Sequence, residues 1–326
     1  MQQPKAPPRR VNGDGEERRV GVELEFAGLT VEETARHLHD EFGGTVEQLD
    51  AHRNVLKHPD WGEATIELDV QYVHRKDEER EDGEAEKFGF LDVLDISDKV
   101  RARLGDALTG LVPVEIVFPP IAWSKLGELN AAFEVLRRHG ALGTRESPLY
   151  AFGLHLNVEV ATGSAAEILD TLRAYMVMAE GLHEKVDMDL TRWVLPHAAP
   201  FPDEYASKIC ALDYPADLSG MIDDYLEMNP TRNRELDMLP LFAHLDPDRV
   251  KAQISDALVK PRPTYHYRLP NADLGDPDWS AVTEWNRWIA IEDLAEDKDR
   301  LHAAMREFLN RDRGLGARLQ RYLGLK

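Results

Sequence analysis

The chain has 326 residues, of which 43% are hydrophobic and 30% are charged, a globular balance with enough apolar residues for a sizeable core. Its net charge of −21 argues against a nucleic-acid partner, because phosphate contacts need a basic stripe and none is visible. The lone Cys210 excludes an intrachain disulfide and a cysteine zinc site. No apolar run approaches the roughly 18 residues of a membrane span, and the N-terminus lacks the apolar core of a signal peptide. We therefore expect a cytoplasmic protein without a membrane partner.

The predicted elements begin after an irregular N-terminal stretch. Residues 1–17 contain prolines and glycines but no periodic apolar pattern, which predicts a disordered tail. A strand is expected from about Arg19, and the capping box Thr30–Glu33 opens a helix. A second strand is expected over about 64–73. The charge run at 76–87 then predicts a solvated acidic loop.

The middle of the chain alternates helices and strands. It predicts a helix over about 92–108, a buried strand over 111–120 that its prolines end, and a helix over 125–138. A long helix follows at about 164–185, after a strand that contains a histidine. A shorter helix is expected near 216–227.

The fold class follows from the kind of strands present. The strands lack the continuous Val/Ile-rich pattern of a doubly wound parallel sheet. From about residue 280 the chain is mostly helical, with Trp285 and Trp288 as expected packing residues. We predict an α+β fold: one catalytic domain over 18–326, with a mostly antiparallel sheet that carries the active site and helices on its other face.

Three strand-like stretches place polar or ionisable side chains two residues apart inside apolar runs. Successive side chains of a strand point to opposite faces, so each such pair shares one face. The apolar residues between them pack the sheet, which leaves the polar pair for function. The three stretches and their pairs are Gly21–Phe26 with Glu23 and Glu25, Phe152–Val158 with His155 and Asn157, and Tyr265–Leu269 with His266 and Arg268.

Carboxylates recur in otherwise apolar strands, and such crowding needs a cation to offset the repulsion. The residues concerned are Glu23, Glu25, Glu67, Asp69 and Glu115. Mg²⁺ or Mn²⁺ would supply that charge through oxygen ligands, and His155 would suit Mn²⁺ better. Metal binding does not require the arginines Arg268, Arg232 and Arg234. Their presence favours phosphoryl transfer. A metal-dependent hydrolase on the same carboxylates is the alternative, although it leaves the arginines without a purpose.

These motifs, taken in order, resemble the carboxylate–amine ligases related to glutamine synthetase and glutamate–cysteine ligase. The match is closest to the bacterial amidoligases and covers roughly residues 18–290. The resemblance implies a glutamine-synthetase-like sheet. It also implies a two-step reaction in which ATP phosphorylates a carboxylate and an amine captures the acyl-phosphate. The partners would be small-molecule or peptide carboxylates and amines. Some relatives assemble into rings, so an oligomer stays open. The segments on which the family resemblance rests are Gly21–Gly28, Ile66–Asp69, Val114–Pro120, Phe152–Asn157, Asn229–Leu236 and Pro263–Pro270.

The resemblance also implies a role for each motif residue. Asn157 would neighbour the nucleotide, and Arg268 would contact the transferred phosphate. Arg232 and Arg234 would make other substrate or phosphate contacts, although either could instead cap the preceding helix. The metal ligands that it implies are Glu23, Glu25, Glu115, His155 and either Glu67 or Asp69.

One position departs from the pattern. The superfamily commonly has a glutamate two residues before the final arginine, and this chain has His266 there. An imidazole would still ligate Mn²⁺, or it would only form a hydrogen bond, so the number of metal ions stays open. The missing charge also leaves a third hypothesis, a nucleotide-binding adaptor without catalytic turnover.

Overall fold

The fold was analysed in a computed structural model of the whole chain. The predicted acidic loop at 76–87 and the predicted helix at 92–108 lie outside the residues that the structure describes. The described residues are 2–50, 52–69, 113–146, 152–186, 198–254 and 258–311.

An open antiparallel sheet forms the centre of the described structure. Its eight strands lie in the order β2-β3-β4-β5-β1-β6-β8-β7, and every neighbouring pair is antiparallel. The predicted α+β class and antiparallel sheet are therefore confirmed. In chain order the strands are β1 (Arg19–Phe26), β2 (Thr45–Asp50), β3 (Arg53–His58), β4 (Gly62–Leu68), β5 (Val114–Ala122), β6 (Leu154–Glu159), β7 (Leu236–Asp237) and β8 (Thr264–Tyr267).

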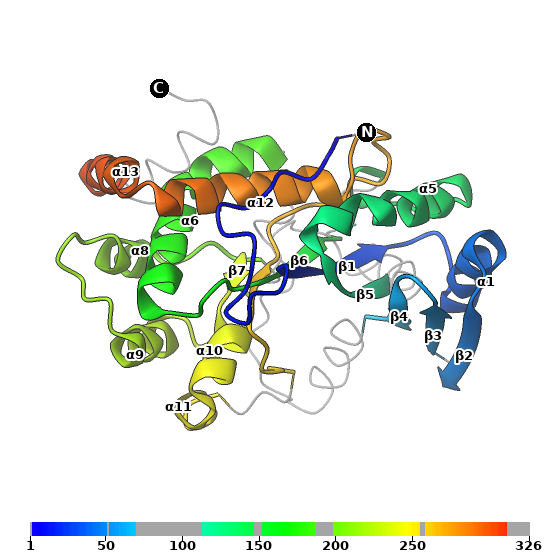
Figure 1. Ribbon diagram of the computed structural model, residues 1–326, viewed down its shortest axis with the longest axis horizontal. Helices are drawn as coiled ribbons and strands as arrows, with labels where there is room; N and C mark the ends of the chain where they lie inside the picture. Colours follow the sequence, from blue (N-terminus) through cyan, green and yellow to red (C-terminus); the bar gives the residue numbers. More distant parts are fainter. Residues whose placement is uncertain are drawn as a thin grey trace, which may run out of the picture.

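Helices surround the sheet on more than one side. In Figure 1, α12 and α5 lie above the strands, α6 rises from the β7 end to reach α12, and α8 to α11 gather near the β7 end. None of the described helices has both the length and the apolar character needed to cross a membrane. The helices are α1 (Val31–Phe42), η1 (Trp123–Leu129), α5 (Asn130–Arg138), η2 (Thr144–Glu146), α6 (Ala165–Val186), α8 (Asp203–Ile209), α9 (Leu218–Met228), α10 (Leu239–Leu245), α11 (Pro247–Lys251), α12 (Ala281–Glu296) and α13 (Lys298–Asn310).

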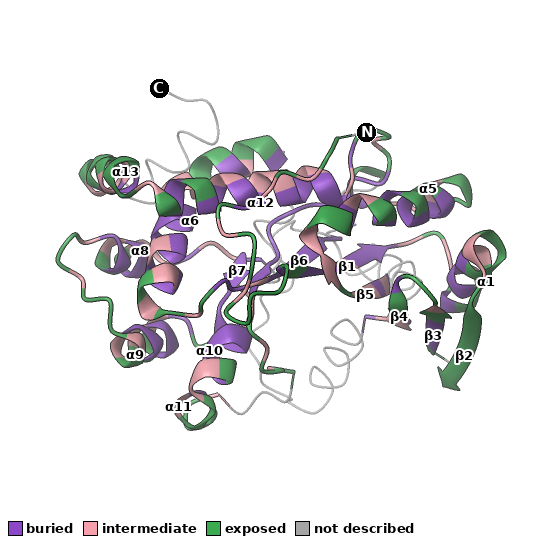
Figure 2. Ribbon diagram, viewed as in Figure 1, coloured by how far each residue is buried: buried purple, intermediate pink, exposed green. Residues whose placement is uncertain are grey.

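The alternation along β1 shows how the two faces of the sheet differ. Its apolar residues Val20, Val22, Leu24 and Phe26 are fully buried in the core. Figure 2 shows the same burial along β1, in contrast to the exposed edge strand β2. Because side chains alternate between faces, the intervening Glu23 and the residues in register with it occupy the opposite face.

Aromatic contacts identify the face that the helices cover. Phe118 of β5 lies 6.3 Å from Phe133 of α5, measured between ring centroids. Tyr265 and Tyr267 of β8 lie 5.3 Å and 5.4 Å from Trp288 of α12. The predicted packing role of Trp288 is confirmed. The helices therefore bury the apolar and aromatic side of the strands.

The capping box at the start of α1 is confirmed. The backbone amide of Glu33 donates to Thr30 Oγ1 at 3.1 Å, and the amide of Thr30 donates to Glu33 Oε2 at 3.0 Å. This reciprocal pair satisfies two amides that would otherwise lack partners at the helix start. The helix then packs against β3, β4 and α5, which fixes one end of the sheet.

The N-terminal stretch differs from the disorder expected of it. The amide of Lys5 donates to Asn286 Oδ1 at 2.8 Å, and Trp285 Nε1 donates to the Lys5 carbonyl at 2.8 Å. Closer to β1, the buried Arg18 forms a bidentate pair with Glu292 of α12, at 2.7 Å and 2.8 Å. The absence of a periodic apolar pattern predicted disorder here, but polar groups on α12 bind the backbone of the segment instead.

Strand β5 does not end at its prolines. It continues through Pro119 and Pro120 to Ala122, which pairs with Arg19 of β1. The register shifts between Val20 and Val22 of β1, so the prolines coincide with an irregularity in the ladder. A proline is tolerated at such a place because no regular ladder bond requires its missing N–H.

Candidate functional site

A row of carboxylates crosses three neighbouring strands. The register places Glu67 of β4 opposite Glu115 of β5, and Glu115 opposite Glu25 of β1. Burial raises the pKa of Glu115 well above its usual range, and the negative charges of the neighbouring carboxylates raise it further. Burial also raises the pKa of Glu25, and the nearby charge of Asp69 adds to this effect. The carboxylates of this row therefore repel one another, and a bound cation would relieve that repulsion.

The two candidate ligands on the β4 side differ in their surroundings. Glu67 accepts a hydrogen bond from Arg53 Nε on the adjacent strand β3 and pairs with its charge. Asp69 follows β4 and is only 6% exposed, and its amide donates to the Pro113 carbonyl at 3.0 Å. Asp69 thus has the more buried position, and Glu67 forms an ion pair with Arg53.

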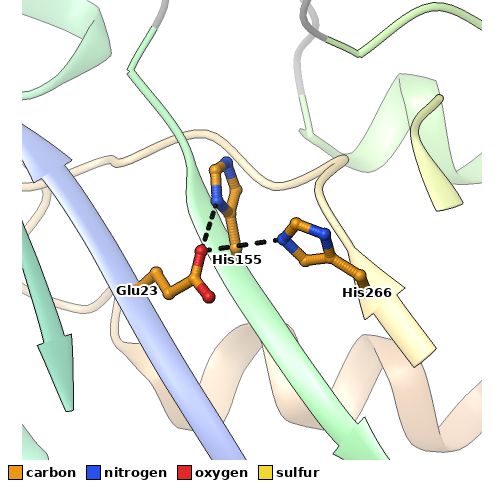
Figure 3. A group of neighbouring side chains, drawn as sticks. All are labelled: Glu23, His155 and His266. Atoms are coloured by element: carbon orange, nitrogen blue, oxygen red, sulfur yellow. Dashed lines mark hydrogen bonds and ion pairs between the residues drawn. The ribbon is translucent and has the colours of Figure 1, made fainter. Parts of the chain in front are cut away.

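Glu23 of β1 is the centre of a second group, drawn in Figure 3. Its Oε1 accepts from Asn157 Nδ2 at 2.7 Å, and its Oε2 lies 3.1 Å from His155 Nδ1. The same Oε2 lies 3.6 Å from His266 Nε2. Figure 3 shows both imidazole rings directed at this one oxygen. Three strands, β1, β6 and β8, thus bring one carboxylate and two imidazoles together.

The protonation of this group is set by burial and by the close contacts. Burial alone would raise the pKa of Glu23, but the close contacts and charges of His155 and His266 hold it well below its usual range. Burial lowers the pKa of His155, and this effect outweighs the neighbouring carboxylates. An ionised Glu23 beside a neutral His155 is the pair of forms that binds a metal ion.

Arg268 lies beside this group, whereas Arg234 does not. Arg268 is 2% exposed, and its charge lowers the pKa of both Glu25 and His155. Arg234 Nη1 instead donates to the Pro200 carbonyl at 2.6 Å. Arg232 is half-buried in the segment between α9 and β7. Of the three predicted arginines, Arg268 therefore has the position closest to the carboxylates.

The structure adds two charged residues that the sequence analysis did not single out. Asp237 of β7 is in register with His266 and places Oδ2 3.4 Å from its Nδ1. Arg262 lies just before β8 and places Nη2 3.9 Å from Glu23 Oε1. A signal for Arg262 was present, because it continues the two-residue alternation of His266 and Arg268. Asp237 lies in a short run with no such pattern.

A glycine makes room for one of these contacts. Gly21 of β1 is directly opposite Asn157 of β6. A Cβ at Gly21 would lie 3.3 Å from the Cβ of Asn157, closer than nearly all such contacts. The missing side chain therefore lets the Asn157 amide extend along the sheet to Glu23.

The side chains on this face suit a divalent cation. Glu23, His155 and His266 offer ligand atoms that all lie within 4.8 Å of one another, and so do Glu25, Glu115 and His155. His266 Nε2 and Asn157 Oδ1 are buried without a hydrogen-bond partner among the described residues. Carboxylate oxygens and imidazole nitrogens are ligands that Mn²⁺ and related ions accept.

The fold and these side chains define an α+β protein with a candidate metal centre on the polar face of its sheet. The family model described as "Putative amidoligase enzyme" matches residues 16–290. The chain belongs to this amidoligase family, and membership supports a place among the ligases. No curated protein and no solved structure matched the chain. The likeness of its sheet to that of glutamine synthetase stays a prediction.

Proposed function

We propose that the protein is an ATP-dependent carboxylate–amine ligase that uses Mg²⁺ or Mn²⁺ and proceeds through an acyl-phosphate. The observation that carries this proposal is the pair of adjoining ligand groups that share His155, with Arg268 beside them. A hydrolytic metal site would use the carboxylates alone. The buried guanidinium of Arg268 is better explained by a phosphoryl group that must be neutralised.

In the first step, an oxygen of the substrate carboxylate attacks the γ-phosphorus of ATP. The bond from that phosphorus to the β–γ bridging oxygen breaks, and ADP leaves with the electron pair. The bound divalent metal would supply charge neutralisation at the polyphosphate oxygens, held by Glu23, Glu25, Glu115, His155 and His266. Arg268 and Arg262 would place their guanidinium groups against the transferred phosphoryl group. The two arginines flank β8, Arg262 before its first residue and Arg268 after its last.

In the second step, the amine nitrogen attacks the carbonyl carbon of the acyl-phosphate. The carbon–oxygen bond to phosphate breaks, so the products are an amide, inorganic phosphate and a proton. Carboxylates such as Glu25 and Glu115 line the same face and would attract the cationic form of the amine, which must lose a proton before its nitrogen attacks. The substrates are accordingly a small-molecule or peptide carboxylate and an amine.

The test is release of ADP from Mg·ATP or Mn·ATP in the presence of pooled amino acids and amines. We expect release that requires both a carboxylate and an amine. Added hydroxylamine should capture the acyl-phosphate as a hydroxamate, which a colorimetric iron assay detects. Glu25→Gln and His155→Ala should abolish both signals.

The matched control is Glu63→Gln, the same chemical change at a β4 carboxylate whose side chain is 68% exposed. It should keep full activity. Binding of ATP without ADP or hydroxamate in any pool would support the adaptor hypothesis instead. Metal-dependent hydrolysis of amides without ATP would support the hydrolase and overturn the ligase.

A further inference from the structure

The imidazole of His266 gives one end of the candidate site an unusual set of ligands. His155 Nδ1 and His266 Nε2 both lie against the same oxygen of Glu23, at 3.1 Å and 3.6 Å. We infer that Glu23, His155 and His266 hold a divalent first-row transition metal such as Mn²⁺ or Co²⁺ in preference to Mg²⁺. This inference rests on the divalent metal of the proposed function and specifies which metal the site selects.

The spacing of the three ligand atoms fits a shared ion. Two ligands each about 2.1 Å from one ion, and about 90–110° apart at the ion, are separated by roughly 3.0–3.4 Å. The contacts of His155 and His266 with Glu23 Oε2 are close to these separations. The two imidazole rings meet edge to face, with centroids 5.4 Å apart, so their ring atoms do not block each other. Small side-chain rotations would admit the ion.

The chemistry of the ligands determines which ion fits best. Mg²⁺ prefers oxygen ligands and an octahedral shell with several waters. Imidazole nitrogen suits the later first-row ions, whose affinity for such sites rises from Mn²⁺ through Co²⁺. Two nitrogens and one carboxylate therefore favour a transition metal. A glutamate in place of His266 would restore an oxygen-rich site and the Mg²⁺ affinity that goes with it.

Asp237 is the positioning residue for His266. Its Oδ1 accepts from the Leu239 amide at 3.0 Å, which fixes the carboxylate, and its Oδ2 lies 3.4 Å from His266 Nδ1. Asp237 is fully buried, so water does not compete for this contact. A carboxylate at Nδ1 keeps the proton on that nitrogen and leaves the lone pair on Nε2, the atom that lies 3.6 Å from Glu23.

The experiment measures metal binding to the metal-free protein without ATP. Co²⁺ is titrated and followed by visible absorption, and Mg²⁺ is measured by its competition with Co²⁺. We expect His266→Glu to lower the preference for Co²⁺ over Mg²⁺ by about tenfold or more. Asp237→Asn should raise the Kd for Co²⁺ by about 10- to 100-fold. His244→Glu, the same change at an exposed helix residue, should alter neither Kd.

A second measurement takes its decisive result from the wild-type protein. Pulsed electron paramagnetic resonance of the Mn²⁺-loaded wild-type protein should show coupling to two imidazole nitrogens, and His266→Gln should leave one. Coupling to one nitrogen or none in the wild-type protein would overturn the inference. An unchanged preference in a folded His266→Glu variant would do the same.

These outcomes are separate from those of the ligase test. Two nitrogen couplings without ADP release under any condition would leave the metal site standing and remove the proposed reaction. Carboxylate- and amine-dependent ADP release, together with an unchanged metal preference in His266→Glu, would support the reaction and remove the inference on metal selection.

Discussion

Replacing Glu115 by glutamine should stabilise the metal-free protein. The facing carboxylate oxygens of Glu115 and Glu25 lie within 4.8 Å of each other. At an effective dielectric constant of about 20, two unit charges at this distance repel by about 3.5 kcal/mol. Protonation relieves part of this repulsion, because burial and the neighbouring carboxylates raise the pKa of Glu115. We therefore expect Glu115→Gln to raise the free energy of unfolding by about 1–3 kcal/mol at pH 8.

The dependence on pH has a defined sign. The folded pKa of Glu115 is raised above its ordinary value of 4.5, so the native state binds this proton more tightly than the unfolded chain. The resulting stability is present below the ordinary value and is lost as the pH rises through the folded pKa. The stability advantage of Glu115→Gln over the wild type should therefore shrink as the pH is lowered from 8 to 5, because the raised folded pKa favours protonation of the wild-type carboxyl as the pH falls.

The assay is calorimetric melting in a chelator at pH 5 and pH 8, and again in excess MnCl₂. With an unfolding entropy of about 2.1 cal/mol/K per residue, the expected gain at pH 8 is about 2–4 °C. In excess MnCl₂ the wild-type protein should melt above Glu115→Gln. Manganese at about 100 times its Kd adds about 2.7 kcal/mol to the free energy of unfolding of the wild-type protein. Glu63→Gln should shift neither melting point. A Glu115→Gln variant that melts below the wild type in chelator at pH 8 would refute the reasoning.

Three further predictions concern a buried ion pair with α12 and two residues of the candidate site. Glu292→Gln removes the carboxylate that pairs with the buried guanidinium of Arg18. Urea denaturation should show that the free energy of unfolding falls by about 3–5 kcal/mol. Arg268→Lys keeps the charge but loses the planar fork, so kcat/KM for ATP should fall by about 100-fold or more while the far-UV circular dichroism stays unchanged. Gly21→Ala should displace the Asn157 amide from its contact and weaken Co²⁺ binding roughly tenfold, with a change in stability below about 1 kcal/mol. Full activity in Arg268→Lys, or unchanged Co²⁺ binding in Gly21→Ala, would count against these roles.

Much of the candidate site could be predicted from the sequence because its residues follow the period of a strand. Glu23, His155 and His266 each stand two residues from a second polar group, inside an apolar run. In the structure these three side chains converge on one face of the sheet. Alternation is a local property of the chain and does not depend on which strands are neighbours.

Features that depend on strand pairing could not be predicted in the same way. Asp237 reaches His266 because β7 pairs with β8, and nothing within the sequence of β7 specifies that partner or its register. The exposed hairpin β2–β3 was not anticipated, because its outer strand buries no side chain and so has no apolar pattern. The predicted role of Arg234 rested on its place in a motif, but its contact with the Pro200 carbonyl comes from tertiary packing.

The hydrogen bonds that orient the site's carboxylates come mainly from neutral groups. Glu23 accepts from the amide of Asn157, Glu25 accepts from the amide of Gly153 at 2.8 Å, and Asp237 accepts from the Leu239 amide. Neutral donors fix a carboxylate in place without cancelling its charge. Glu67 at the outer end of the row is different, because Arg53 both binds it and neutralises it.

This difference explains how the fold can keep a repulsive cluster in order. The fully buried apolar residues on the helix side of β1 stabilise the strand in the sheet. This stabilisation does not depend on the charges on the opposite face. The neutral donors then keep the ligands close together without adding positive charge to the site. Such a site is less stable when empty than its glutamine variants and gains most when a cation enters. The stability of the apolar face is therefore what allows the opposite face to be built for binding.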